Sequence, residues 1–491
     1  MKFEYVTPEQ AGISSAKVLK FIKTLEKYNM CTHSFIMARG NKIFAEGYYA
    51  PFHKDFKHRM YSITKSFVSV AIGLCEEDGL LSLDDKLLKY FPEYRNENTN
   101  ELLEDLSIRD MLMMSTANSA SVDWFEEAGD DRVATYFMNT ADKVSGTTWR
   151  YDSQGSYMMG AIVEKLTGMP FLEYMKDRFL RAAGFSEDSY CLKAPGKYSW
   201  GDSGMMCTAM DLLRFARFVM NNGTIDGVRY MNEEYLKAAT SKQASNDHGG
   251  AIAFDNLGYG YQIWKTFNDG FYFYGMGGQY AICDREKDFI FIVNADNQGS
   301  EHASRIILFH ELHQSIIDGL GEPLAEDKKA YEELEAHIAN LKLFSQNESL
   351  TSPWAEKING KTYELAENVM GIEYVHFDIH GEEGVLTYKN AQGEKKLPFG
   401  FGHNVFCKFP EEGYPDMTGS VPEPGHMYDC AVSADWPIER LLRIKVQVID
   451  KYYGIMDMEF GFKDNKISIY MQKIAEDFLD GYMGTAYGYQ K

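Results

Sequence analysis

The chain has 491 residues, of which 45% are hydrophobic and 25% are charged, and its formal net charge is −22. This composition is typical of a globular protein, and the length exceeds one ordinary hydrophobic core, so two domains are expected. The excess of negative charge argues against nucleic acid or an anionic membrane surface as a partner.

The N-terminus and the cysteines predict a cytoplasmic protein with free thiols. The first fifteen residues lack the apolar stretch of a signal peptide, and no run is long enough to span a bilayer. The seven cysteines are an odd number and include no Cys-x-x-Cys pair. No metal site is expected, because no cluster of histidine and cysteine has the spacing of zinc ligands.

The first two thirds of the chain predict helices placed between two sets of strands. Residues 8–30 predict a helix with Pro8 in its first turn, and residues 33–38 and 42–49 predict a pair of strands. The later elements are a helical stretch over 84–182, an amphipathic helix over 209–222 capped by Thr208, strands over 259–266, 271–274, 279–284 and 288–294, and a helix over 301–319. This order predicts an α/β sandwich of the α+β type, with a helical insertion.

The last third of the chain changes character twice. Residues 325–352 are charged and begin as a helical pattern, which we interpret as a connector between domains. After residue 353, short alternating segments are separated by glycine, asparagine and aspartate, and Asp464-Asn465 predicts a hairpin turn. We therefore expect a first domain over 1–324 and a small all-β domain over 353–491.

The strongest chemical motif is Ser62-x-x-Lys65, which stands at the start of the apolar run 67–74. Residues three apart lie on one face of a helix, so the Ser62 hydroxyl is expected beside the Lys65 amine. A serine becomes a nucleophile when a base takes its proton, and a lysine serves as that base when its surroundings favour the neutral form. The helix N-terminus would favour an oxyanion. The plain alternative is a helix start with a surface lysine.

Further motifs follow the Ser-x-x-Lys motif in a fixed order. They are GLLSLDDKLLKYFP at 79–92, LSIRDML at 106–112, GTTWRYDS at 146–153, YMMGAIVEKLTG at 157–168 and YGMGGQY at 274–280. Together they resemble the serine β-lactamase-related hydrolase family, which includes class C β-lactamases, DD-peptidases, D-aminopeptidases and related esterases. The resemblance covers about residues 5–320. It implies a β-lactamase/DD-peptidase-like antiparallel sheet flanked by helices, and a mechanism without metal or organic cofactor.

The resemblance also implies roles for single residues. Ser62 matches the nucleophile and Lys65 its general base. Tyr151 matches the second motif and would share proton transfer with Lys65 before protonating the leaving group. The backbone N–H groups of Ser62 and Gln279 match the oxyanion hole. Gly277 and Gly278 match a strand against which the substrate lies flat, where a Cβ atom would block it.

Three positions near these motifs depart from the family pattern or add to it. Ser153 stands where the second motif has asparagine, and Met276 stands where the third motif has a basic or polar residue. Both changes place β-lactam and peptide recognition in doubt and favour a neutral ester or amide. Asp152 adds an anion beside the site, or is simply solvated.

The expected function is a serine hydrolase that cleaves an ester or amide of a small molecule or short peptide through an acyl-enzyme on Ser62. One alternative is a D-aminopeptidase or amidohydrolase acting on D-amino-acid peptides or ω-amino oligoamides. Another is a non-catalytic binding member of the same fold, which the changes at Ser153 and Met276 would suit. The C-terminal unit resembles the small barrel or lipocalin-like appendage of some members. Such an appendage can cap the site or pair subunits, so a homo-oligomer stays open.

Overall fold

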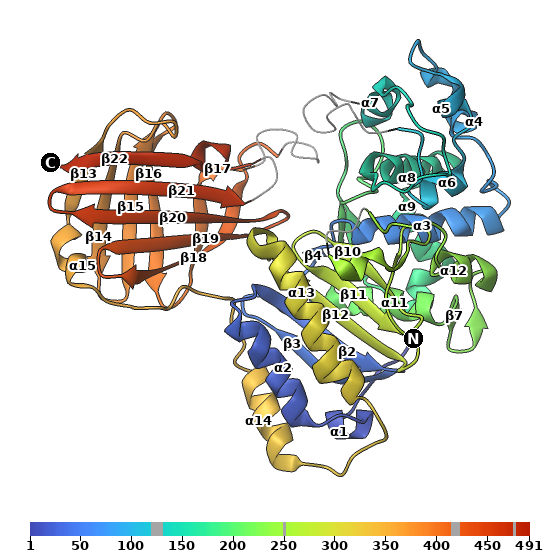
Figure 1. The fold of residues 1–491 in the computed structure, drawn as a ribbon, viewed down its shortest axis with the longest axis horizontal. Helices are drawn as coiled ribbons and strands as arrows, with labels where there is room; N and C mark the ends of the chain where they lie inside the picture. The colour runs from blue at the N-terminus through green and yellow to red at the C-terminus, as the bar shows by residue number, and fades with distance from the viewer. Residues whose placement is uncertain (119–130, 249–251, 414–422, 475–477) are drawn as a thin grey trace. The chain divides into compact units, whose positions relative to one another are not determined.

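The computed structural model describes residues 1–491 except 119–130, 249–251, 414–422 and 475–477. The chain forms two compact units, the first over residues 1–342 and the second over the described residues of 343–491. The first is a mixed α/β unit and the second is a β-barrel (Figure 1). The predicted fold class is therefore confirmed for both parts of the chain.

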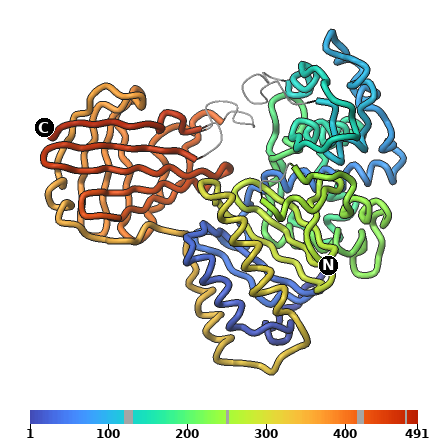
Figure 2. Tube along the Cα trace, in the orientation of Figure 1, coloured from blue at the N-terminus to red at the C-terminus, as the bar shows by residue number. Residues whose placement is uncertain are grey.

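A seven-stranded sheet forms the centre of the first unit, as counted among the described residues. Its order is β1 (Glu4–Tyr5), β3 (Lys42–Tyr48), β2 (Thr32–Arg39), β12 (Phe289–Ala295), β11 (Gln279–Asp284), β10 (Phe271–Gly275) and β9 (Trp264–Lys265). The neighbours are antiparallel except β1 and β3, which are parallel. The pairing of β2 with β12 joins distant parts of the chain, as the blue and yellow traces of Figure 2 show.

Helices cover both faces of this sheet (Figure 1). On one face lie α2 (Ser15–Lys27), α13 (Glu301–Glu311) and α14 (Lys328–Ile338), where Phe21 meets Phe291 edge-on at 5.7 Å between ring centroids. On the other face lie α3 (Ile63–Glu77) and α11 (Ala209–Met220), where Phe215 packs 5.3 Å from Phe273. Because side chains alternate along a strand, a fully buried strand such as β12 serves both faces.

The helical insertion lies between β4 (His58–Arg59) and β9. After α3 it contains α4 (Leu87–Tyr90), α5 (Glu101–Glu104), α6 (Ile108–Leu112), α7 (Arg132–Met138), α8 (Ser153–Thr167), α9 (Phe171–Met175), α10 (Arg181–Ala183), α11 and α12 (Glu233–Ala239). Its short strands are β5 (Tyr190–Cys191), β6 (Met205–Cys207), β7 (Thr224–Ile225) and β8 (Val228–Arg229). Among the described helices, none is long and apolar enough to cross a membrane.

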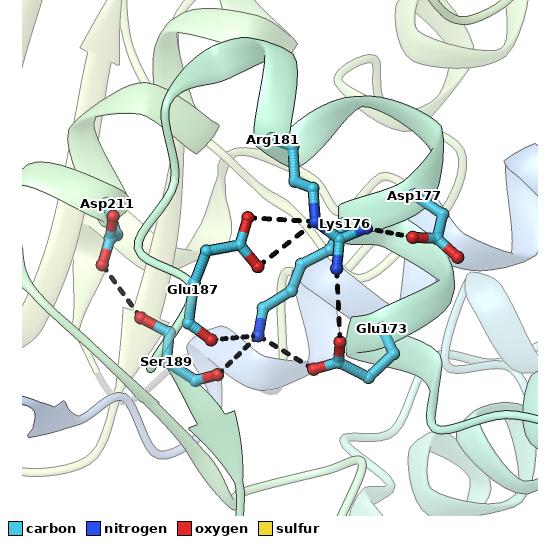
Figure 3. Close-up of polar contacts among 7 residues, drawn as sticks. All are labelled: Glu173, Lys176, Asp177, Arg181, Glu187, Ser189 and Asp211. Carbon is cyan, nitrogen blue, oxygen red and sulfur yellow. Dashed lines mark hydrogen bonds and ion pairs between the residues drawn. The ribbon is translucent and has the colours of Figure 1, made fainter.

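Polar contacts around the buried Lys176 tie this insertion together (Figure 3). The Lys176 ammonium donates to the backbone oxygens of Glu187 and Ser189 at 2.8 and 2.9 Å and to the Glu173 carboxylate at 2.8 Å. Asp211 accepts from the Ser189 hydroxyl and completes the capping box of α11 with Thr208. The predicted cap at Thr208 is confirmed.

Two predicted elements differ from the structure because local backbone geometry interrupts them. The helix expected over 8–30 is divided into α1 (Pro8–Ala11) and α2, since Gly12 ends α1 at φ 94° and Ser14 caps α2. The helix expected over 301–319 ends as α13 at Glu311 and continues as a π-helical and a 3-10 turn.

The expected connector over 325–352 is not a separate element. Leu334 of α14 is fully buried in the core of the first unit, and His337 pairs with Glu26 of α2 at 2.9 Å. Residues after 342 belong to the second unit, where the Gln346 N–H donates to the Ser433 hydroxyl at 3.0 Å. The unit boundary thus lies at 342/343, because the apolar face of α14 is covered by α2.

The second unit is a barrel of antiparallel strands preceded by α15 (Pro353–Ile358). The strands are β13 (Lys361–Leu365), β14 (Tyr374–His380), β15 (Glu383–Asn390), β16 (Gly393–Phe401), β17 (Val405–Glu412), β18 (Met427–Ile438), β19 (Leu441–Ile449), β20 (Tyr453–Lys463), β21 (Lys466–Ile474) and β22 (Gly484–Gln490). A parallel pairing of β16 with β18 closes it. Asp464, at φ 54°, turns β20 into β21, which confirms the predicted hairpin.

Candidate active site

Ser62 and Lys65 lie together at the start of α3. Ser62 occupies the N-cap position, where a serine hydroxyl ordinarily accepts a backbone N–H of the first turn. Here the hydroxyl makes no capping bond among the described residues and instead meets the Lys65 amine, with 2.8 Å between Oγ and Nζ. Lys65 is 2% exposed, so the alternative of a surface lysine is wrong.

The Lys65 amine is held by groups from two other segments. It donates to the backbone oxygen of Asp202 at 2.7 Å and lies 5.2 Å from the ring centroid of Tyr151. Burial raises the pKa of the Asp202 carboxyl, while Lys65 and Arg132 act in the opposite direction. The Asp202 carbonyl and the Tyr151 ring therefore hold the Lys65 amine in one orientation, in which it contacts the Ser62 oxygen.

The backbone before Ser62 is strained and firmly packed. Tyr61 has φ 48°, an uncommon conformation for a residue with a bulky side chain. The Arg59 guanidinium stacks 4.1 Å above the Tyr61 ring and donates to the Ser203 hydroxyl at 2.9 Å. The Thr64 hydroxyl donates to the Tyr61 carbonyl at 2.6 Å. These contacts hold the turn that presents Ser62.

Hydrogen bonds through His33 of β2 and His58 support the backbone before Ser62. His58 Nδ1 lies 2.8 Å from the Arg59 carbonyl, so this nitrogen donates and His58 Nε2 accepts. His33 Nδ1 lies 2.8 Å from that acceptor and therefore donates to it. The Cys31 thiol faces His33 Nε2 at 3.7 Å. A proton added to His58 would set its Nε2–H against the Nδ1–H of His33.

The buried pair His33 and His58 leads us to expect that the stability of the first unit depends on pH. Burial lowers the pKa of His58 to about 3 and the pKa of His33 well below its ordinary value. An unfolded histidine takes up a proton near pH 6.5, so the contribution is complete above that pH and is lost as pH falls toward 3. For each proton that is taken up on unfolding, the unfolding free energy falls by about 1.4 kcal/mol per unit that the pH is lowered.

Urea unfolding at several pH values between 7.5 and 5 tests this expectation. His58→Asn should show a shallower fall in unfolding free energy than the wild type. Replacing the exposed His53 by asparagine is the control and should leave the slope unchanged. Equal slopes in the wild type and His58→Asn would contradict the role given to this pair.

Tyr151 precedes α8 and lies in a cluster of aromatic rings. Its ring stacks on Trp264 at 6.0 Å with 20° between the planes and meets Trp149 at 6.4 Å. Trp264 is 6% exposed and lies in β9, beside β10 of the sheet. The sheet thus positions the tyrosine whose ring faces Lys65.

Asp152 and Ser153 begin the helix that follows Tyr151. Asp152 is the N-cap of α8 and accepts from the Gly155 N–H at 3.0 Å, and Ser153 is the first helical residue. Asp152 is 4% exposed, so the expectation that it is solvated is wrong. Its carboxylate instead stabilises the helix start, and burial raises its pKa.

Met276, Gly277 and Gly278 form the tight turn between β10 and β11. Gly277 and Gly278 have φ 83° and 106°, which explains the need for glycine at both positions. They lie in the turn and outside the regular strands, so the backbone conformation by itself requires glycine at both positions, and the approach of a substrate stays a prediction. A Cβ on Gly275 would lie 2.2 Å from the Met60 carbonyl oxygen. The turn therefore sits against the backbone that leads into Ser62.

A cavity of about 620 Å³ opens beside Tyr151. It is lined by Met113, Ser115, residues 146–151, residues 243–246 and His248. The described lining residues include no carboxylate, and Arg150 is their permanently charged side chain. Residues 119–130 and 249–251 lie outside the described residues.

Two contributors to the site were not singled out from the sequence. The first is the Asp202 carbonyl, which orients Lys65, and a backbone oxygen has no sequence signature. Glu301 accepts from the Gly277 N–H at 3.3 Å and from the Tyr274 hydroxyl. The only sequence hint to Glu301 was its place at the start of a predicted helix.

The family of the chain follows from comparison with known proteins. A family model described as Beta-lactamase matches residues 20–312, which is more than half of the chain. The chain belongs to the beta-lactamase family. This confirms the resemblance to the serine β-lactamase-related hydrolases, and it is this first unit that carries the Ser62 site.

Individual proteins of the beta-lactamase fold extend this finding. The 6-aminohexanoate-dimer hydrolase of Paenarthrobacter ureafaciens is 26% identical over 282 residues, covering 53% of this chain and 72% of that protein. The solved structure of EstCE1, described as a hydrolase with promiscuous acyltransferase activity, covers 61% of this chain and 98% of its own at a TM-score of 0.50 and 13% identity. The structure described as SurE with D-Leu covers 92% and 94%, with a TM-score of 0.50 and 14% identity. The family and its hydrolase relatives support a hydrolase.

Proposed function

We propose that this protein is a serine hydrolase that cleaves esters or amides of small molecules or short peptides through an acyl-enzyme on Ser62. The observation that carries the proposal is the 2.8 Å contact between Ser62 Oγ and the buried Lys65 Nζ, formed where an ordinary N-cap serine would bind its own helix. A Ser62 hydroxyl that capped α3 would be engaged by a backbone N–H. Here the hydroxyl instead lies beside Lys65, the proposed base.

Each group has a role in the proposed reaction. Lys65 donates one N–H to the Asp202 carbonyl and, as general base, takes the proton of the Ser62 hydroxyl as Oγ attacks the carbonyl carbon. The backbone N–H groups of Ser62 and Gln279 hold the oxyanion. Tyr151 and Lys65 return the proton to the leaving group, and water then attacks the acyl-enzyme.

Two motif positions bear on the substrate class. Met276 offers no cation at the third motif, and Ser153 offers a short hydroxyl in the second. Both features favour an uncharged ester or amide over a β-lactam or a peptide with a free carboxylate.

An amidohydrolase is the second candidate, favoured by the likeness to a protein named 6-aminohexanoate-dimer hydrolase. Parallel assays with p-nitrophenyl butyrate and butyryl p-nitroanilide show whether this serine hydrolase is an esterase or an amidohydrolase. An esterase is expected to turn over the first alone, whereas an amidohydrolase turns over both.

Labelling with a fluorophosphonate tests whether Ser62 is activated. We expect intact mass to show one adduct on the full chain, and peptide mapping to place it on Ser62. Ser62→Ala should take up no label. Ser66→Ala is the matched control, because the Ser66 hydroxyl lies one helical turn away and donates to the Gln262 carbonyl at 2.8 Å. An unlabelled, folded wild type would contradict the hydrolase and favour the non-catalytic member of the fold.

A further inference from the structure

The turn that would supply one oxyanion donor is made of residues that do not hold themselves in place. Glycine loses more conformational freedom on ordering than any other residue, and two glycines stand together at Gly277 and Gly278. An oxyanion hole works only when its donors are already aimed at the developing charge. Something outside the glycines must therefore order this turn.

The side chain of Gln279 supplies that order. Its Nε2 donates to the Met276 carbonyl at 2.8 Å and to the Ala295 carbonyl at 2.7 Å, while its Oε1 accepts the Ala295 N–H at 3.0 Å. Both amide protons and one oxygen lone pair are thus used. Gln279 is 0% exposed, so water does not compete for these bonds.

Ala295 is itself a fixed point. It ends β12, and the Asn297 that follows receives the Cys31 N–H on its side chain at 2.8 Å and donates its own N–H to the Gly277 carbonyl at 2.8 Å. On the other side of the turn, Glu301 of α13 accepts the Gly277 N–H. Gln279 is the one member of this network that also carries the proposed oxyanion donor on its own backbone.

We propose that the Gln279 side chain is a positioning residue that clamps the Met276–Gly278 turn to β12 and so aims the Gln279 N–H at the oxyanion. The inference rests on the proposed function of Ser62. Loss of the clamp lets the turn move while the rest of the sheet stays paired. A donor displaced by about 1 Å costs up to about 100-fold in rate, and the cost falls on the transition state.

Two variants and one control test this role. Gln279→Ala removes all three bonds. Gln279→Glu keeps the shape of the side chain but places a carboxylate oxygen where Nε2 donates to the Met276 and Ala295 carbonyls. Protonation of the new carboxyl restores one of these two donors. Asn294→Ala is the control: Asn294 is a buried amide of β12 that donates to the Ser34 hydroxyl at 3.1 Å and does not touch the turn. The readouts are the rate constant of fluorophosphonate labelling, kcat and KM for p-nitrophenyl butyrate, and Tm.

We expect the labelling rate and kcat of Gln279→Ala to fall about 10- to 100-fold, with KM changed less than about threefold. The rate of Gln279→Glu relative to wild type should rise as pH falls and the new carboxyl is protonated. Asn294→Ala should lower Tm with an unchanged labelling rate.

Labelling of folded Gln279→Ala at the wild-type rate would overturn the inference and leave the Ser62 hydrolase intact. A pH-independent ratio for Gln279→Glu would do the same. A wild type that takes up no label at all would overturn both.

Discussion

Lys65→Met is expected to lower kcat/KM for an ester substrate about 1,000-fold, because general base catalysis contributes about 100- to 10,000-fold. Methionine has nearly the volume of lysine and fills the same buried space, but its thioether cannot take the Ser62 proton. Fluorophosphonate labelling should slow by a similar factor, since it depends on the same proton transfer. Steady-state kinetics and time-resolved intact mass measure the two effects.

Two further lysine variants separate the base from the charge and from packing. Lys65→Arg places a guanidinium at the site that cannot give up its proton, so this variant should be as inactive as Lys65→Met. Lys176→Met removes another lysine that is 3% exposed and bonded to backbone oxygens, and it should lower Tm while leaving kcat/KM unchanged. Retention of a tenth of the wild-type kcat/KM by Lys65→Met would refute the assignment of Lys65 as the base.

Arg305→Met is expected to lower the unfolding free energy by about 3–5 kcal/mol, the largest stability loss we anticipate in the first unit. Arg305 of α13 pairs with Asp255, and the two side chains are 5% and 1% exposed. The Tyr272 hydroxyl also donates to Asp255 at 2.6 Å. Removing the guanidinium leaves a buried carboxylate without its counter-charge, and that desolvation is the main cost. Urea unfolding measures the change.

A double variant shows whether the cost comes from the unpaired charge. Arg305→Met combined with Asp255→Asn should lose less stability than Arg305→Met alone, because no charge is then buried. The exposed pair Lys328–Glu332 serves as control, and Lys328→Met should change the unfolding free energy by less than about 1 kcal/mol. Additive losses in the double variant would contradict the buried-charge explanation.

Several features of the fold were already determined by local sequence. The strands β2, β3, β10 and β11 were predicted nearly to their ends, because β-branched and aromatic runs between turn residues have few alternatives. The Thr208 cap and the Asp464 turn were predicted for the same reason, since each depends on residues within a few positions. The boundary at 342/343 was missed because α14 is charged over most of its surface, and its contacts with α2 and β3, which assign it to the first unit, form only in the folded chain.

In the candidate site, too, local contacts could be predicted from the sequence and contacts between distant segments could not. Ser62 and Lys65 could be paired from spacing alone, because a helix brings residues three apart onto one face. The Asp202 carbonyl that orients Lys65, the Trp264 ring beneath Tyr151 and the Ala295 backbone that holds Gln279 come from distant segments. Their contacts depend on how the sheet stacks its strands and how helices pack on it, and backbone oxygens leave no trace in a sequence pattern. The sequence by itself therefore determined which groups could react, whereas the tertiary structure decided how each is aimed.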